Sequence, residues 1–470
     1  MPVLARVGAA DMSVHPYHTR RMVRLLSATA SDAVANISLS EPPALGHWWW
    51  DTRETNDGGV IFDGEIRRFL EAAIAQPALP PLPSTGFDLR AINPATSFGR
   101  GGVRIIQQLS PFRLSELDLR LGTDGAWRVE TSNVRALRIS ATDLPAPTPW
   151  SEQSRGFVID GQPLPPRTLD GSSDVWKPLC FELVHQSPDQ SASEEATAWQ
   201  STPGAMIWQH CASPTVASAG SQSGSLTDGV VDAAPRGPAS SGPARQVYAS
   251  RFHIVVGTQS PDWDSQRTYS ALSVYLANQH VAAQGTHVSI LNDTEWLRRD
   301  LQDNAVFVGG PDTNLAVARM QQQQRLPIRF SLAGQEGRGM GGASTASACQ
   351  AGAVIGSFSV GPCTFNAPST GIVFTAPTGR VDAESGESAG LHMILAGTDL
   401  PGIRQLVEYS FASNQALTRA PLSNMVPDFL VAGPRFRERG YGGALAVGHW
   451  DHRWRWAQDV SSMRCSFARK

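Results

Sequence analysis

The spacing of hydrophobic residues changes twice along this chain, and both changes limit how it can fold. Residues 84–186 alternate apolar and polar side chains between Gly, Pro and Asn breaks, as in FDLRAINP, LSELDLRLG and WRVETSNV. Residues 1–83 and 247–470 instead contain short apolar runs separated by segments with helical spacing. A period of two indicates half-buried β-strands, and strands that alternate with helices indicate an α/β sheet. The chain therefore predicts a mixed α/β and β fold.

The order of these segments predicts the domain organisation. A chain of 470 residues has room for about three domains of roughly 150 residues each. We expect a short α/β section over 1–83, an antiparallel β-sandwich or small barrel over 84–186, a Ser-, Gly- and Pro-rich linker or arm over 187–246, and an α/β domain with a parallel sheet over 247–470. The first section is too short to cover both faces of a parallel sheet, so we expect another surface to cover its open edge.

The C-terminal α/β section contains a candidate ligand crevice. Its predicted strands over 252–256, 305–308 and 391–395 are followed by Gly257-Thr258, Gly309-Gly310-Pro311 and Gly397-Thr398. Ligands of open α/β sheets bind outside the carboxyl ends of the strands. Thr258, Gly310 and Thr398 are therefore the candidate crevice residues.

Charge and hydropathy exclude several partners. The net charge of −3 and the pI of about 6.4 provide no strong basic field, so we expect neither a nucleic-acid partner nor an anionic membrane. The first residues, MPVLARVGAADMSV, lack the basic start and the apolar run of a secretory signal. No stretch approaches the roughly 18 apolar residues of a membrane helix. We expect a cytoplasmic chain without a signal peptide.

The cysteines and histidines form no recognisable ligand set. The five cysteines are widely spaced and include no C-x-x-C pair; they are Cys180, Cys211, Cys349, Cys363 and Cys465. Zinc sites and disulfide frameworks are usually recognised from closer, paired spacings. The sequence therefore predicts no metal site, no disulfide framework and no cofactor.

Three short motifs have weak structural context. The run Gly386-Glu-Ser388-Ala-Gly390 matches the nucleophile-elbow pattern G-x-S-x-G, but the predicted strand follows it instead of preceding it. A plain turn is the favoured interpretation, and Ser388 stays open as an alternative nucleophile. The G-x-G-x-x-G run over 337–342 precedes a poor helix, which favours a flexible loop. The tryptophans over 48–50 favour packing over a stacking platform.

One pair of residues fits a catalytic order. Asp11 follows the first predicted strand, and His47 lies in the loop after the next strand, between Gly46 and Trp48. In α/β-hydrolases the catalytic residues follow one another in the order Ser, Asp, His, with the acid and the base on successive strand-end loops. Asp11 and His47 fit the last two places, and no serine fits the first.

The segments around this pair resemble a known family. GAADMSVHPYHTRRM and GHWW resemble the end of the catalytic domain in the prolyl-oligopeptidase-like and esterase-like hydrolases of fungi. GGVRIIQQLSPFRLSELDLR and WRVETSNVRAL are similar to the β-domain that follows it. HIVVGTQS, AVFVGGPDTN, LAGTDLPGIRQL, VPDFLVAG and GGALAVGHWDHRWRW are similar to the C-terminal α/β domain of these proteins.

The resemblance implies roles for residues of the first section. Asp11 would be the triad acid and His47 the general base, and 1–83 would be a truncated remnant of an α/β-hydrolase sheet. The nucleophile-bearing region would precede residue 1. A histidine without a neighbouring nucleophile has nothing to activate.

Two functions from different classes follow. The preferred hypothesis is a non-catalytic structural or interaction protein on a truncated hydrolase scaffold, present as a homo-oligomer or in a larger assembly such as the particle of a fungal virus. Its location would be the cytoplasm or the virion. The alternative is a serine esterase or peptidase, completed by another chain or by a new nucleophile such as Ser388.

Overall fold

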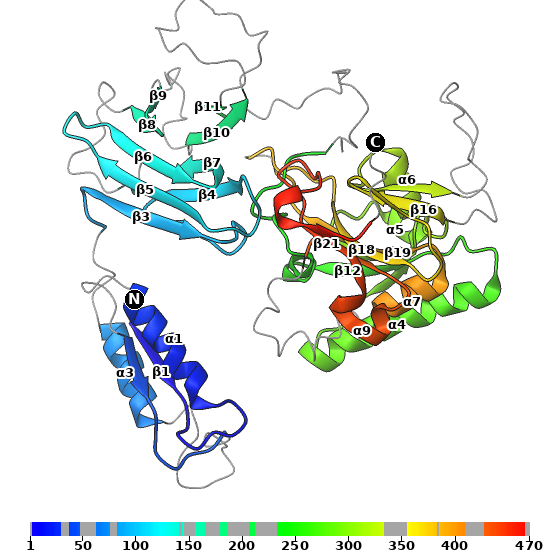
Figure 1. The fold of residues 1–470 in the computed structure, drawn as a ribbon, viewed down its shortest axis with the longest axis horizontal. Coiled ribbons are helices and arrows are strands. Elements are labelled where there is room, and N and C mark those ends of the chain that lie inside the picture. The colour runs from blue at the N-terminus through cyan, green and yellow to red at the C-terminus, as the bar shows by residue number, and fades with distance from the viewer. Residues whose placement is uncertain are drawn as a thin grey trace, which may run out of the picture. The chain divides into compact units, whose positions relative to one another are not determined.

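A computed structural model describes most of the chain, in two units that are treated separately below (Figure 1). The first unit is Met1–Pro83 and the second is Ser84–Lys470. The described residues are 2–29, 37–47, 63–75, 82–140, 143–144, 156–164, 179–185, 206–211, 233–332, 355–382, 385–408 and 427–465.

The described part of the first unit is a β-α-β crossover followed by helix α3 (Gly64–Ala75). Strands β1 (Val3–Arg6) and β2 (Ile37–Ser40) pair in parallel. Helix α1 (Pro16–Thr29) lies between them in the sequence, and α3 (Gly64–Ala75) follows. Among the described residues of this unit, Val7 is the only hydrophobic residue that is buried. A two-stranded sheet with so little buried apolar surface is marginal on its own.

The second unit begins with a β-sandwich. One sheet has the order β3-β5-β6-β8-β9, and the other has the order β11-β10-β7-β4. The side chains of Phe157 and Phe181, one from each sheet, are 5.5 Å apart between ring centroids, so the sheets pack face to face. The strands are β3 (Gly86–Ala91), β4 (Val103–Gln108), β5 (Ser115–Leu121), β6 (Trp127–Ser132), β7 (Val134–Ile139), β8 (Phe157–Ile159), β9 (Gln162–Leu164), β10 (Leu179–His185) and β11 (Met206–His210).

The sandwich differs from the expected antiparallel domain in two respects. Strands β6 and β8 pair in parallel, whereas all the other pairs in the two sheets are antiparallel. Strand β11 lies inside the tract over 187–246 that composition predicts to be a linker. Its Trp208 is only 3% exposed, so part of this tract contributes to the sandwich core.

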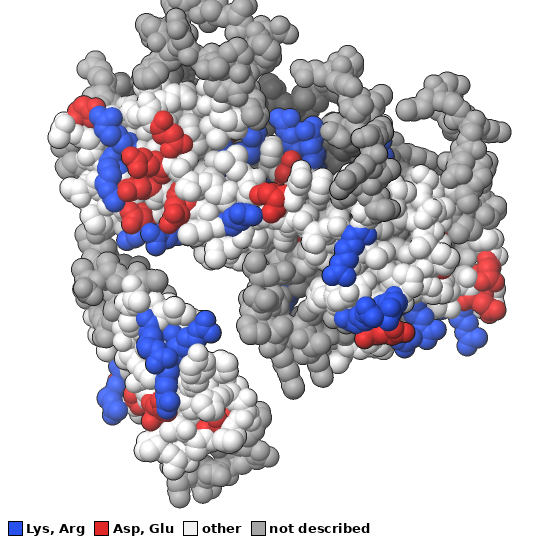
Figure 2. Space-filling model, in the orientation of Figure 1, with Lys and Arg blue, Asp and Glu red and all other residues white. Residues whose placement is uncertain are grey.

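The outer face of the first sheet is charged. Figure 2 shows acidic and basic side chains interleaved over β3, β5 and β6. Ion pairs connect neighbouring strands there, as between Arg120 and Asp88 at 3.1 Å and between Arg90 and Glu116 at 2.9 Å. Alternation along each strand places apolar residues inward and these charges outward, as expected for a sheet with one solvated face.

The C-terminal part of the second unit is built on an eight-stranded sheet with the order β13-β12-β14-β19-β18-β20-β21-β22. Strands β13, β12, β14 and β19 are parallel, and β18, β20, β21 and β22 continue the sheet in antiparallel pairs. The strands are β12 (Phe252–Val256), β13 (Ile290–Asn292), β14 (Asn304–Val308), β18 (Gly371–Pro377), β19 (Leu391–Gly397), β20 (Phe429–Ala432), β21 (Ala444–Gly448) and β22 (Ser462–Met463).

The expected parallel sheet is therefore confirmed for β13, β12, β14 and β19 and wrong for the pairs formed by β18, β20, β21 and β22. The loop over 378–390 connects β18 to β19 as a hairpin rather than through a crossover helix, and this reverses the strand direction.

Helices α4 (Trp263–Gln284) and α7 (Leu400–Glu408) lie on one face of the sheet, and α5 (Asp293–Arg299) and α6 (Leu315–Gln322) lie on the other (Figure 1). Further elements are α9 (Phe436–Arg439) and a small sheet of β15 (Arg329–Leu332), β16 (Ile355–Val360) and β17 (Cys363–Phe365).

A buried ion pair anchors the segment over 233–250, the last part of the tract expected to be a linker, to this sheet. The Arg236 guanidinium donates to both carboxylate oxygens of Asp428, each at 2.9 Å, and the two side chains are 5% and 0% exposed. Arg236 also donates to the carbonyl oxygen of Trp450 at 2.6 Å and lies 5.0 Å from the ring centroid of Trp454. Burial alone would raise the pKa of Asp428, but Arg236 and His449 lower it to about 2.

Two disulfides contradict the expectation that the chain has no disulfide framework. Cys180 bonds to Cys211 across β10 and β11, and Cys363 bonds to Cys465, with Cα–Cα distances of 5.3 and 5.9 Å. The partners are 31 and 102 residues apart in sequence. Only strand pairing and the return of the chain terminus bring them together, so local spacing contains no signal for either bond.

None of the described helices is long and apolar enough to cross a membrane.

Candidate functional site

The loops that follow β1 and β2 form one hydrogen-bonded structure. The backbone amide of Ala9 donates to the carbonyl oxygen of Pro42 at 3.0 Å, and that of Ala10 donates to the carbonyl oxygen of Leu45 at 2.9 Å. Gly8 permits this approach, because a Cβ atom there would lie 2.3 Å from the Leu45 carbonyl oxygen. Gly8 follows β1, and its lack of a side chain allows the two loops to stay in contact.

These loops place Asp11 against His47. His47 Nδ1 lies 2.9 Å from Asp11 Oδ2. The other oxygen, Oδ1, accepts hydrogen bonds from the backbone amides of Ser13 and Val14, both at 2.8 Å. The Asp11 side chain is 5% exposed and the His47 side chain is 24% exposed. The carboxylate is fixed from two sides, and the imidazole is only partly covered.

Hydrogen bonds keep Asp11 ionised in this position. Burial by itself would raise the pKa of the Asp11 carboxyl group, but the amide of Val14, the His47 ring and the amide of Ser13 outweigh it and lower the pKa below its usual value. An ionised carboxylate at Nδ1 fixes the tautomer and orientation of the imidazole and stabilises its protonated form. With Nδ1 so engaged, Nε2 is the atom through which the ring would take a proton from a nucleophile.

The two sequence-predicted residues of the first section are thus brought together, in the strand-end positions from which they were recognised. The two backbone hydrogen bonds to Asp11 were not part of the prediction. The sequence D-M-S-V does indicate these two hydrogen bonds, because an aspartate before a helix commonly accepts hydrogen bonds from the backbone amides two and three residues later.

Ser388 lacks the exposure and the backbone geometry of a catalytic nucleophile. Its side chain is 1% exposed, and its hydroxyl donates to the carbonyl oxygen of Gly390 at 3.2 Å. Its backbone forms isolated bridges with Arg236 and Val381, and strand β19 begins only at Leu391. A nucleophile elbow needs an exposed hydroxyl on a turn from strand to helix, which this turn lacks.

The predicted crevice residues lie at the ends of neighbouring strands, but their polar groups are used internally. Thr258 Oγ1 donates to Asp293 Oδ1 at 2.6 Å, and Thr398 Oγ1 donates to the carbonyl oxygen of Ala367 at 2.9 Å. A Cβ atom on Gly310 would lie 2.4 Å from Ile355 Cδ1, so a side chain already fills that space.

A carboxylate that sequence analysis did not single out lies beside this crevice. Asp312 follows the Gly-Gly-Pro turn after β14, and burial raises its pKa to about 6. Its position two residues after a strand-end glycine could have identified it.

The tryptophans over 48–50 and the glycine run over 337–342 lie outside the described residues. Within the described ranges, no group of three or more His, Cys, Asp or Glu side chains could hold a metal ion.

Comparisons with known proteins provide a distant partial match. An uncharacterized secreted protein of the fungus Arthroderma benhamiae is 26% identical over 159 residues, which cover 33% of this chain and 16% of the fungal protein. The matched segment thus spans about one sixth of that relative. No protein family and no solved structure matches the chain.

Proposed function

We propose that this chain supplies the acid and the base of a serine-hydrolase triad. Asp11 orients His47, and His47 takes the proton from a serine hydroxyl that another polypeptide segment contributes. The contact that carries the proposal is the 2.9 Å distance from His47 Nδ1 to an Asp11 carboxylate whose second oxygen is held by two amides. An acid on one strand-end loop and a base on the next is the arrangement of α/β-hydrolase triads.

The surface of the first unit supports a partner for its sheet. Met22 and Leu25 on α1 are 57% and 50% exposed, and Leu70 and Ile74 on α3 are 50% and 82% exposed. Large apolar side chains gathered on two helices of one small unit are typical of a protein-binding surface. In this proposal, β1, β2 and the helices complete a larger hydrolase sheet, and the nucleophile lies on the segment that they contact.

A fluorophosphonate probe tests the triad, because it reacts with activated serines. The chain is produced with an affinity tag, recovered with the proteins bound to it, and labelled. The labelled serine is then located by mass spectrometry. We expect labelling to be lost in His47→Ala and retained in His18→Ala, a histidine on the exposed face of α1.

The proposal fails if no labelled serine depends on His47. It also fails if His18→Ala and His47→Ala reduce labelling equally, because the loss would then follow from general damage to the first unit.

We further propose that the chain functions outside the cytosol. Disulfides persist mainly in oxidising compartments, and this chain has two. The fungal relative is described as a secreted protein. This proposal replaces the cytoplasmic expectation. Alkylation mass spectrometry of the native protein would show four protected cysteines, and free thiols at those positions would contradict it.

A second candidate function is a non-catalytic interaction protein that forms an oligomer or part of a larger assembly. The exposed apolar residues of α1 and α3 favour it. Light scattering would then give a native mass well above 50.4 kDa, and Ile74→Glu would reduce it. A monomer without bound proteins would contradict this candidate.

A further inference from the structure

A small cavity lies at the end of the C-terminal sheet opposite the predicted crevice. It has a volume of about 180 Å³, below the roughly 300–1,000 Å³ of pockets for drug-sized ligands. It is bounded by the last turns of α5 and α6 and by the start of β19, with Trp296 and Met320 among its apolar walls. Its size admits a single small ring with one polar group.

The cations of this cavity have no carboxylate partner among the described residues. Arg325 donates to the carbonyl oxygen of Thr378 and to Gln323 Oε1, and Arg319 is exposed on α6. Both arginine side chains line the cavity. Burial lowers the pKa of Arg325, and repulsion from the charge of Arg319 lowers it further. An anion between them would relieve this repulsion.

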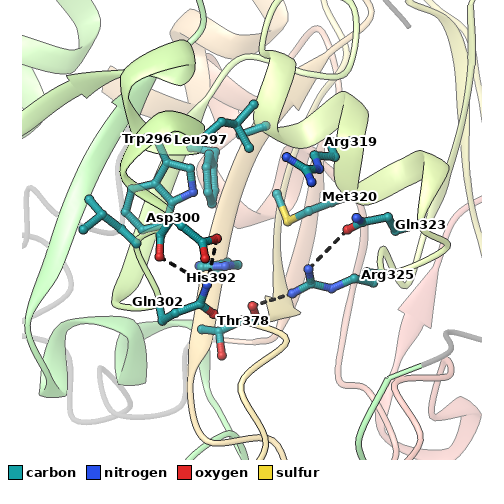
Figure 3. A pocket seen from close by; sticks show the side chains of 13 residues that line it. Trp296, Leu297, Asp300, Gln302, Arg319, Met320, Gln323, Arg325, Thr378 and His392 are labelled. Atoms are coloured by element: carbon teal, nitrogen blue, oxygen red, sulfur yellow. Dashed lines mark hydrogen bonds between the residues drawn. The ribbon is translucent and has the colours of Figure 1, made fainter. Parts of the chain in front are cut away.

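The charge of the lining sets the charge of the ligand. Asp300 is the only carboxylate among the described lining residues, and Figure 3 shows it with Trp296 on the side of the cavity opposite Arg319 and Arg325. Two guanidinium groups and one carboxylate leave one net positive charge. A monoanion balances that charge, and a second negative group near Asp300 would be repelled.

A buried histidine adds a polar group without adding charge. His392 is 4% exposed, and its Nδ1 has no hydrogen-bond partner in the described structure. Its strand neighbours in register are Ala305 and Ala376, whose small side chains leave room beside the ring. Burial lowers the pKa of His392 to about 3, so the ring stays neutral near pH 7.

We propose that this cavity binds a small aromatic monocarboxylate. Its carboxylate contacts Arg319 and Arg325, and its ring packs against Trp296 and Met320 beside His392. The carboxylate supplies the missing anion, and the ring matches the apolar walls and the small volume. This inference is independent of Asp11 and His47, which belong to the other unit.

Isothermal titration with three isosteric probes tests the charge requirement. Benzoate, benzamide and benzamidine share one shape and carry charges of minus one, zero and plus one. We expect benzoate to bind at least about tenfold more tightly than benzamide, and benzamidine to bind more weakly still.

A pair of matched variants tests the location. Arg319→Gln should weaken benzoate binding about tenfold. Arg298→Gln changes an arginine in the last turn of the adjacent helix α5 that does not line the cavity, and benzoate affinity should be unchanged. Equal thermal unfolding midpoints of the two variants show that both are folded.

Three results would overturn the proposal. They are equal affinities for benzoate and benzamide, no detectable benzoate binding to the unaltered chain, and unchanged benzoate affinity in Arg319→Gln.

Discussion

Asp11 combines two tasks in one carboxylate. One oxygen accepts from the amides of Ser13 and Val14 and so fixes the turn before α1, and the other oxygen contacts His47. The residue that shapes the loop is therefore also the residue that orients the imidazole. The pair could be predicted from the sequence because the order of strand, acid, strand and histidine is local. The sequence could not predict the burial of the carboxylate, which depends on contact between the two loops.

Arg236 and Asp428 are a second residue-scale feature, with a structural role. In Arg236→Met the Asp428 carboxylate loses its cation while it stays 0% exposed. Removing one partner of a buried pair typically costs about 3–5 kcal/mol. We predict a loss of that size in urea unfolding followed by tryptophan fluorescence, since Trp450 and Trp454 both contact Arg236.

Arg251→Met is the matched control for this experiment. Arg251 lies 3.6 Å from Asp303, but its side chain is 78% exposed, so its loss should cost less than about 1 kcal/mol. Equal losses in the two variants would contradict the structural role of Arg236.

Glu387 predicts a dependence of stability on pH. It is 9% exposed, and burial raises its pKa to about 7 from 4.5. Between these two values the folded chain retains a proton that the unfolded chain has released, so the free energy of unfolding falls as pH rises. Glu387→Gln lacks this ionisation. Its stability relative to the unaltered chain should increase by about 2–3 kcal/mol from pH 5 to pH 8; parallel pH profiles would contradict the prediction.

At the scale of elements, the loop contact after β1 and β2 depends on Gly8. Gly8→Ala would force a Cβ atom against the Leu45 carbonyl and separate Asp11 from His47. We predict that the low-field proton resonance of the His47 Nδ1–H group is lost in this variant. Gly46→Ala, in the same loop as His47, adds a methyl group into open space and should retain the resonance. Its retention in Gly8→Ala would show that the loops adapt.

The two disulfides should contribute unequally to stability. In the chain-entropy description, closing a loop of 31 residues contributes roughly 3.7 kcal/mol and closing one of 102 residues contributes roughly 4.7 kcal/mol. We predict that Cys363→Ser/Cys465→Ser loses more stability in denaturant than Cys180→Ser/Cys211→Ser. The opposite order would show that native-state strain or packing outweighs loop entropy.

The elements themselves were predicted with uneven success, for physical reasons. Strands with strong local patterns, such as β12 and β14, agree with the expected ranges to within one residue. The expectation of a parallel sheet over 247–470 was wrong for its antiparallel part because β18, a fully buried run, was not recognised as a strand. Strand β11 was hidden in a tract of linker-like composition, because only its pairing with β10 buries Trp208.

At the scale of the whole molecule, the two units differ in how completely they bury their apolar surface. The second unit has a continuous core over its C-terminal sheet and helices, whereas Val7 is the only buried hydrophobic residue described in the first unit. The residues proposed for acid–base chemistry therefore lie on the unit with the smaller core. This difference agrees with a first unit that another polypeptide segment completes.

The rate of serine labelling by a fluorophosphonate in the Asp11→Asn variant tests the central claim most directly. Asparagine retains an acceptor for the Ser13 and Val14 amides but removes the charge opposite His47. We predict that the labelling rate falls on the order of 10⁴-fold, as expected when a triad base loses its orienting carboxylate. An unchanged rate in Asp11→Asn would contradict the assignment of Asp11 and His47 as an acid–base pair.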